Sequence, residues 1–353
     1  MTPKAATNHA QSRLTRRAFS LIELLVVITI IAVVIAITVP ALSGARELAR
    51  KSSTESSINS LVQGIGQFQT DNQRAPGYFS PEDMGHDDNL TRGFSSMQNI
   101  MLELVGGPVA DTGGSSTNPV VGPSSSNEVE VDLALIGIGD KSKGYYTPDA
   151  KDYQPVQGIA TSVPEHNELP EVLDAWGMPI LAWVENDFGS TMNDDSDIDD
   201  FAQISAPANS SDPSARFYWA QNAGALSSDA LGERQMEQAE LSLIGKDTTG
   251  DLQEHLAAFL GSPNSSVKTA SAATAILPRV GRGAVVFQSA GSDRVYLSKN
   301  DKGYGRIGGD FFFGRNLTPG SNVNSGQYPR KDGSQGSIDI IDGFNDIVTS
   351  AGN

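Results

Sequence analysis

The strongest pattern along the chain is an uninterrupted apolar run near its N-terminus. Residues 24–42 contain no charged side chain, and Glu23 stands directly before them. A helix of this length spans roughly 28 Å, about the thickness of the hydrocarbon core of a bilayer. The pattern therefore predicts a membrane-spanning helix with a carboxylate at its first turn.

Beyond this run the apolar positions recur at helical spacing. They are Ala45, Leu48, Ala49, Ile58, Leu61, Val62, Ile65 and Phe68. The spacing predicts one helix from about Leu21 to Asn72, whose second half lays an apolar stripe on a globular domain. Pro40 removes one helical hydrogen bond, so we expect a kink or local melting between Pro40 and Gly44, with two separate helices as the alternative.

Charge is distributed unevenly along the 353 residues, which include no cysteine and carry a net charge of −17. Residues 1–18 hold four basic side chains and no acid, so the formal charge after residue 18 is −21. The basic residues before the apolar run favour a cytoplasmic N-terminus. The acidic remainder repels nucleic acid, and no nucleic-acid partner is expected for it.

Three kinds of N-terminal segment are compatible with this run. A secretory signal peptide has a shorter apolar core and then a small-residue cleavage site, which "ALSGA" at residues 41–45 imitates. A plain membrane anchor explains the length of the run but not Glu23. The third kind is indicated by residues 16–27, "RRAFSLIELLVV".

This stretch resembles the N-terminus of the type IV pilin-like family, which comprises type IV pilins and type II secretion pseudopilins. The resemblance covers residues 13–72 and implies that prepilin peptidase cuts between Ala18 and Phe19 and then N-methylates Phe19. Ala18 departs from the family, in which glycine usually precedes the cut; alanine is the smallest alternative. Pro40 stands where many members have a helix-kinking proline.

The resemblance also implies a role for Glu23 in assembly, because it would be the fifth residue of the mature chain. A carboxylate inside a bilayer costs on the order of 2.5–3.5 kcal/mol. The terminal amine of a neighbouring subunit would neutralise it only at the correct axial step of a filament. From the sequence, Glu23 has no evident partner within one subunit; the alternative is that it snorkels to the lipid headgroups.

After the long helix the pattern predicts an α+β fold, a small antiparallel sheet with helical and loop insertions. We expect a helix over 95–104, a Gly/Pro/Ser-rich loop over 105–127, and helices within 229–260. The last strands should lie within 283–298 and 337–353. The predicted domains are a leader (1–18), the N-terminal helix (19–72), and a head (73–353) with insertions at about 106–127 and 187–275.

Two parts of the head resemble major pseudopilins. Asp174, Trp176, Gly177 and Pro179 resemble the family's D-P-W-G-N-P-Y turn, although Ala175 and Met178 depart from it. We expect the Trp to plug the sheet against the long helix. An ordinary hairpin is the alternative.

The second part is the C-terminus, where "SAGSD" and "NDIV" resemble the calcium-holding end of the family. The resemblance implies Ca²⁺ ligands at Asp293, Asp342 and Asp346. About forty residues intervene where the family has a short loop, and solvated turn aspartates are the alternative. The acidic stretch at 192–200 lacks the Gly and Glu positions of an EF-hand, so we expect a solvated loop there.

No catalytic motif is present, and the four histidines are scattered, so we do not expect an enzyme. The predicted function is a structural subunit of a type II secretion pseudopilus or a type IV-like pilus. Its partners would be prepilin peptidase, other subunits, membrane lipid, and an inner-membrane platform with a cytoplasmic ATPase. We expect a single pass through a bacterial inner membrane with a periplasmic head. The alternatives are an adhesin or substrate receptor on a pilin anchor, or an anchored hydrolase.

Overall fold

A computed structural model provides the three-dimensional description of the chain. It describes residues 20–105, 118–133, 136, 144–193, 196–209, 212–228, 238–245, 252–262, 278–301, 311–312, 315–316, 328–329, 335–336, 341 and 344–352. The chain divides into two compact units, Met1–Ala49 and Arg50–Asn353. We call the second unit the head.

The N-terminal helix α1 runs without interruption over Leu21–Asn72. These are the bounds that the hydrophobic pattern predicts. The helix passes through Pro40, so the expected local melting and the alternative of two helices are both wrong. The Pro40 carbonyl accepts a hydrogen bond from the Ser43 hydroxyl (2.8 Å), and Ala41 and Leu42 after it are good helix formers, which favours a helical turn despite the missing donor.

The described part of the head is a mixed α+β structure with short elements. Its helices are α2 (Pro81–Met84), α3 (Asn89–Arg92), α4 (Ser96–Leu104), η1 (Pro164–Glu168), α5 (Ile198–Phe201), η2 (Trp219–Asn222), α6 (Ala223–Leu226), α7 (Gln238–Leu241), α8 (Leu252–Leu260) and η3 (Gly291–Asp293). The predicted helix at 95–104 is confirmed as α4. Ser95 caps it, since its hydroxyl accepts from the Gln98 N–H (3.0 Å) and Gln98 Oε1 accepts from the Ser95 N–H (3.2 Å).

The strands form small sheets, almost all of them antiparallel. They are β1 (Val120–Ser124), β2 (Asn127–Glu130), β3 (Tyr153–Pro155), β4 (Pro170–Val172), β5 (Leu181–Val184), β6 (Ala202–Gln203), β7 (Phe217–Tyr218), β8 (Val285–Ser289), β9 (Phe311–Phe312), β10 (Arg315–Asn316), β11 (Tyr328–Pro329), β12 (Gln335–Gly336) and β13 (Ile347–Ala351). The pairs are β1–β2, β3–β4, β9–β10 and β11–β12, with β6–β7 parallel.

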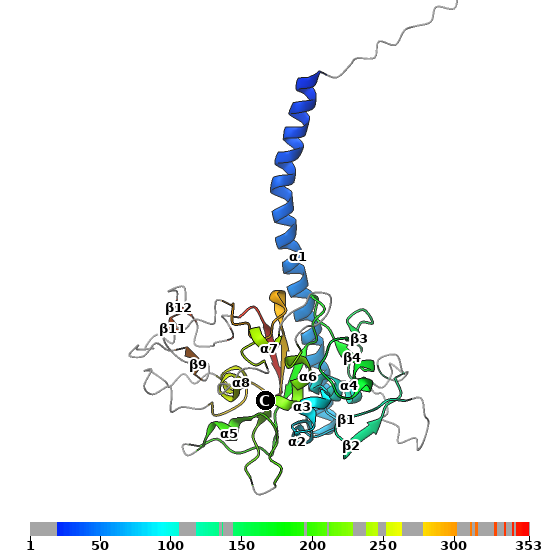
Figure 1. The fold of residues 1–353 in the computed structure, drawn as a ribbon, viewed down its shortest axis with the longest axis vertical. Coiled ribbons are helices and arrows are strands. Elements are labelled where there is room, and N and C mark those ends of the chain that lie inside the picture. The colour runs from blue at the N-terminus through cyan, green and yellow to red at the C-terminus, as the bar shows by residue number, and fades with distance from the viewer. Residues whose placement is uncertain are drawn as a thin grey trace, which may run out of the picture. The chain divides into compact units, whose positions relative to one another are not determined.

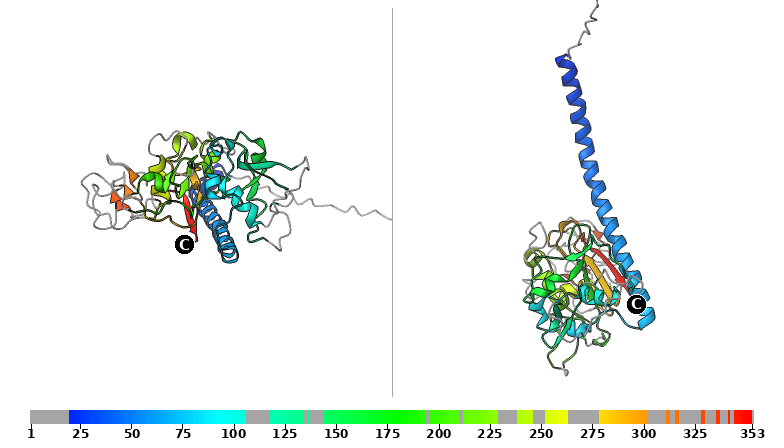
Figure 2. Two further views of the ribbon diagram at one scale, coloured as in Figure 1. Left: turned by 90° about the horizontal axis from the view of Figure 1, so that it is seen from below. Right: turned by 90° about the vertical axis from the view of Figure 1, so that its right-hand side faces the viewer.

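A three-stranded antiparallel sheet in the order β13–β8–β5 organises the head (Figures 1 and 2). Val286 pairs with Trp183 on one side and with Ser350 on the other. The two outer strands of this sheet, β5 and β13, lie more than 160 residues apart in sequence, counted from Val184 to Ile347. Only folding brings them to the same middle strand. The predicted C-terminal strands are confirmed as β8 and β13.

One face of this sheet packs on the part of α1 that belongs to the head. Ile58, Leu61, Ile65 and Phe68 of α1 are buried in one core cluster with residues of all three strands, for example Phe287. The spacing of these four residues places them on one stripe of the helix. Fully burying each contributes about 1.5–3 kcal/mol relative to exposure, so this stripe is a principal attachment of α1 to the head.

The other face of the sheet is also buried. Because side chains alternate along a strand, Leu181 and Trp183 point away from the α1 face and enter a second core cluster with Trp219 of η2 and Phe259 of α8. The Trp183 and Phe259 rings meet edge to face at 6.4 Å. The predicted insertion at 187–275 contributes η2 and α8, so its described part covers the second face of the sheet.

The predicted loop at 105–127 is wrong in its last part. Residues 120–124 form β1, which pairs with β2 in a hairpin. Val120 and Val121 favour a strand, and the hairpin needs a residue without a Cβ at Gly122, where such an atom would lie 2.0 Å from the Asn127 carbonyl oxygen. Residues 106–117 lie outside the described residues.

Candidate functional site

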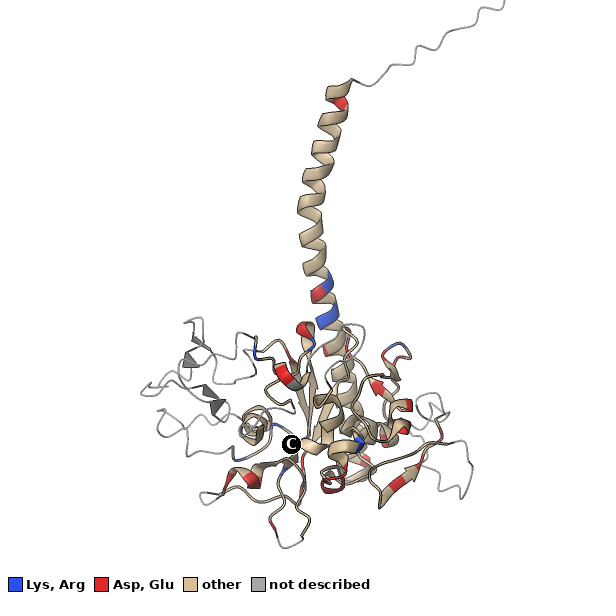
Figure 3. Cartoon of the chain, in the orientation of Figure 1, with Lys and Arg blue, Asp and Glu red and all other residues tan. Residues whose placement is uncertain are grey.

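The N-terminal segment of α1 is exposed and apolar. Its large side chains from Leu21 to Leu42 are between 47% and 83% exposed. Among the described residues, α1 is the one helix with the length and composition to cross a membrane. Figure 3 shows its long stretch without charged residues. The predicted cleavage and methylation residues, Ala18 and Phe19, lie outside the described residues.

Glu23 has a partner within its own chain, which corrects the expectation that it has none. Its carboxylate accepts a hydrogen bond from the Ser20 N–H (2.8 Å), and the Glu23 N–H donates to the Ser20 hydroxyl (3.2 Å). This reciprocal pair is a capping box at the first turn of α1. The Ser-x-x-Glu spacing at positions 20–23 is its sequence signal, and our sequence reading missed it.

The turn between β4 and β5 is organised by Asp174. One carboxylate oxygen accepts from the N–H groups of Trp176 and Met178, both at 2.9 Å. Gly177 has φ +83°, a left-handed conformation that favours glycine. Pro179 pairs with Leu173 in an isolated antiparallel bridge and ends the turn.

The turn is attached to both α1 and the central sheet. The other Asp174 oxygen accepts from the Ser289 hydroxyl at the end of β8 (2.7 Å). The Ala175 N–H donates to the Thr54 hydroxyl of α1 (3.1 Å), and Trp176 is buried in the core cluster that contains the α1 stripe. Burial raises the pKa of Asp174 to about 6, although these hydrogen bonds oppose the shift. The four predicted turn residues thus come together in one structural unit.

Asp293 and Asp346, two of the three predicted calcium ligands, lie close enough for their charges to interact. Asp346 accepts from the Gln288 side chain (2.7 Å) and from the Leu297 N–H, and Asp293 accepts from the Val295 N–H (3.0 Å). Burial raises the pKa of both carboxyls, and the charge of Asp293 adds to the shift at Asp346. Asp342 lies outside the described residues.

Asp301 is a further acid in this region that sequence reasoning missed, because it is far from the predicted motif. It accepts a hydrogen bond from the Asn345 N–H (3.1 Å). Burial, with a smaller contribution from Asp293, raises its pKa to about 6. Within the described residues, no group of three or more metal-ligating side chains is arranged to hold an ion. N–H groups of Gln288 and Leu297 donate to the two oxygens of Asp346, and calcium binding through Asp293, Asp342 and Asp346 stays a prediction.

Two buried titratable groups near the N-terminus of α4 were also missed. Glu171 of β4 is 1% exposed; one oxygen accepts from the Ser95 hydroxyl (2.6 Å), and the other has no hydrogen-bond partner among the described residues. Burial raises its pKa to about 8. His166 of η1 is 2% exposed, and burial lowers its pKa to about 4. Nothing in the sequence marks either residue as buried.

His166 connects three segments as a neutral imidazole. Its Nε2 accepts from the Gly122 N–H of β1 (3.2 Å), so its Nδ1 carries the proton that is donated to the Arg92 carbonyl of α3 (2.7 Å). Its ring also lies 5.3 Å from that of Phe94. A charged imidazole could not accept from Gly122, which makes this contact sensitive to acid.

Within the described part of the chain, one long apolar helix with a capping box at its first turn precedes an α+β head, and this arrangement fits a membrane-anchored, single-pass protein. Residues 13–39 match a family model described as the prokaryotic N-terminal methylation motif. This match, together with the long apolar helix, indicates a type IV pilin-like precursor that prepilin peptidase processes. The motif implies assembly with other pilin subunits. No curated protein and no solved structure matches the chain.

Proposed function

We propose that the protein is a structural subunit of a type II secretion pseudopilus or a type IV-like pilus. The observation that carries the proposal is the methylation motif on an apolar helix whose first turn holds Glu23. Cleavage between Ala18 and Phe19 frees the amine of Phe19, which is then methylated. A platform in the bacterial inner membrane with a cytoplasmic ATPase drives assembly, and the head lies in the periplasm. The proposed role is structural and involves no catalysis.

Glu23 would act in this assembly by exchanging partners. In one chain its carboxylate caps the first turn of α1 through Ser20, which would become the second residue after cleavage. In a filament the amine of a neighbouring Phe19 would pair with the same carboxylate. The capping hydrogen bonds lower the free-energy cost of a carboxylate at this position in a single subunit. The ion pair between subunits then specifies their register.

The head favours the secretion pseudopilus over the pilus. The Asp174 turn shares Asp174, Trp176, Gly177 and Pro179 with the resembling turn of major pseudopilins, and Trp176 lies in the core cluster that contains the α1 stripe. The additional mass over 187–275 is difficult to accommodate at every position of a filament, so a minor or tip-like subunit is proposed. The domain division that accompanies this proposal is a leader (1–18), the N-terminal helix (19–72) and the globular part that follows the helix (73–353).

The mature N-terminus tests the processing step. Mass spectrometry of the membrane-extracted protein should find N-methylated Phe19, and Ala18→Gly should keep or accelerate cleavage. An N-terminus near Gly44 or Ala45 would identify a secretory signal peptide instead and overturn the proposal.

Filament incorporation tests Glu23 itself. Glu23→Gln keeps a hydrogen-bond acceptor for the capping box but removes the charge, and Glu23→Ala removes both. Both variants should be cleaved normally and should be depleted from purified filaments, whereas Glu55→Ala, farther along the same helix, should assemble like the wild type. Normal incorporation of Glu23→Gln would show that the charge has no role in register.

A further inference from the structure

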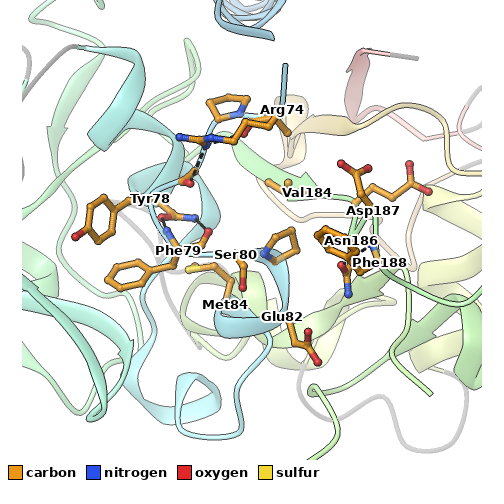
Figure 4. Close-up of a pocket in the computed structure, with 16 residues that line it drawn as sticks. Arg74, Tyr78, Phe79, Ser80, Glu82, Met84, Val184, Asn186, Asp187 and Phe188 are labelled. Atoms are coloured by element: carbon orange, nitrogen blue, oxygen red, sulfur yellow. Dashed lines mark hydrogen bonds between the residues drawn. The ribbon is translucent and has the colours of Figure 1, made fainter. Parts of the chain in front are cut away.

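A cavity of about 430 Å³ lies in the head between the segment that follows α1 and the segment that follows β5. Its lining consists of residues 74–82, 84, 99 and 184–188 (Figure 4). We call it the head pocket. We propose that the head pocket receives a lysine or arginine side chain of a partner protein. The proposal is independent of the filament function.

The floor of the head pocket is held rigidly. The Arg74 guanidinium forms an ion pair with Glu103, and the same carboxylate accepts from the Gly77 N–H (2.7 Å). Asn99 accepts from the Phe79 N–H and donates to the Phe79 carbonyl, both at 2.9 Å. The site is therefore preformed, and ligand binding costs little conformational entropy for ordering it.

The charges of the head pocket favour a cation. Arg74 is the one basic residue in the lining, and Glu103 neutralises it. Glu185 is paired with Arg216, whereas Glu82 and Asp187 are exposed carboxylates that form no ion pair within the described residues. The free charge at the mouth is thus negative, which disfavours phosphates and other anions and attracts a basic group.

Two exposed aromatic rings provide the second element of recognition. Phe188 is 93% exposed and Tyr78 is 48% exposed, and the two lie on opposite sides of the cavity in Figure 4. The backbone at Phe188 is held in place, because its N–H donates to the side chain of the buried Asn186 (3.1 Å). Aromatic faces beside carboxylates bind ammonium and guanidinium groups, as the Arg74 guanidinium over the Phe68 ring (5.1 Å) already shows in this head.

The occupant should come from a different protein. The formal charge after residue 18 is −21, so two copies of the head repel one another at long range. A basic segment of another protein is attracted by the same field. One extended side chain with a terminal cation would place its methylenes against the rings and its charge beside Asp187.

The test measures binding of a defined probe to the full chain in nanodiscs of zwitterionic lipid. Fluorescein-labelled pentapeptides carry lysine, arginine, norleucine or glutamate at the centre of an otherwise uncharged sequence, and fluorescence anisotropy gives each Kd. Lysine and arginine peptides should bind at least tenfold more tightly than norleucine and glutamate peptides. Asp187→Asn should weaken the lysine peptide about tenfold and Phe188→Ala about fivefold, in the range of a partly desolvated ion pair and a cation–π contact.

Matched controls make the test decisive. Asp149→Asn removes an exposed acid outside the pocket and should leave the Kd unchanged. Hydrogen exchange should show protection by the lysine peptide over 74–84 and 184–188. Equal binding of the norleucine peptide, or equal weakening by Asp149→Asn, would overturn the proposal, since the first would mean an apolar groove and the second a diffuse attraction to an acidic protein.

Discussion

Replacing Glu171 with glutamine should remove a large pH-dependent component of the stability of the head. Its pKa is raised from 4.5 to about 8 in the folded chain, because the carboxyl is buried and, in the described part of the chain, only one of its oxygens has a hydrogen-bond partner. In the unfolded chain the group loses its proton near pH 4.5. Between these two values the native state therefore binds a proton that the unfolded state does not, and stability falls as the pH rises.

The magnitude follows from the width of this window. One pKa unit corresponds to about 1.4 kcal/mol, so Glu171 lowers the free energy of unfolding by roughly 3–4 kcal/mol between pH 5 and pH 8. Glutamine keeps an oxygen for the Ser95 hydroxyl and does not titrate. Its own packing cost is the same at every pH and cancels when the change from pH 5 to pH 8 is compared. Burial, with a smaller contribution from Glu171, raises the pKa values of Tyr153 and Tyr296, so both stay neutral throughout.

Urea unfolding monitored by tryptophan fluorescence provides the assay. The three tryptophans, Trp176, Trp183 and Trp219, are all buried in the head, so the signal reports head unfolding even when the membrane helix remains in a nanodisc. The wild type should lose about 3 kcal/mol more than Glu171→Gln between pH 5 and pH 8. Glu165→Gln, an exposed glutamate of η1, should parallel the wild type.

A constant difference between wild type and Glu171→Gln across this pH range would refute the reasoning. It would mean that Glu171 ionises normally in the folded head, and therefore that water or an undescribed residue reaches its second oxygen. Asp174, Asp301 and Asp346 also have raised pKa values, but they are present in both proteins and their contribution cancels to the extent that the sites are independent.

Three further outcomes are expected. Burial lowers the pKa of His166 to about 4, so its contribution to the free energy of unfolding should be present above pH 6.5. This contribution, about 3 kcal/mol, should be lost as the pH falls towards 4, and urea unfolding of His166→Gln should not show the loss. Gly177→Ala should lower the free energy of unfolding by about 1–2 kcal/mol, because the φ of +83° is strained for alanine although a Cβ meets no atom within 4 Å; Gly177→Asn should cost less, and a neutral alanine variant would contradict the strain. If the C-terminal aspartates bind calcium, the melting temperature should be higher in calcium than in chelator, and Asp293→Asn, Asp342→Asn and Asp346→Asn should each shrink the difference. A melting temperature indifferent to calcium would exclude this site.

The sequence by itself determined the methylation motif and the N-terminal helix. The uncharged run and the amphipathic stripe each depend on neighbours within one or two helical turns, so their periodicity predicts a helix from about Leu21 to Asn72, as α1 has it. The methylation motif is equally local, because a peptidase recognises it as a linear segment. The helix N-cap at Ser95 and the turn at Gly177 follow the same logic, since their hydrogen bonds join residues close in sequence.

Tertiary structure alone decided which head residues pair with one another and which are buried. Val184 and Ile347 join the same sheet across more than 160 residues, and no local pattern announces that its second face is covered by η2 and α8. The burial of Glu171 and His166, which gives their pKa values opposite shifts, depends on the packing of segments distant in sequence. The head pocket arises in the same way, from one segment after α1 and another after β5. Local hydrogen bonding can be read from residue order, whereas solvation depends on which distant atoms exclude the water.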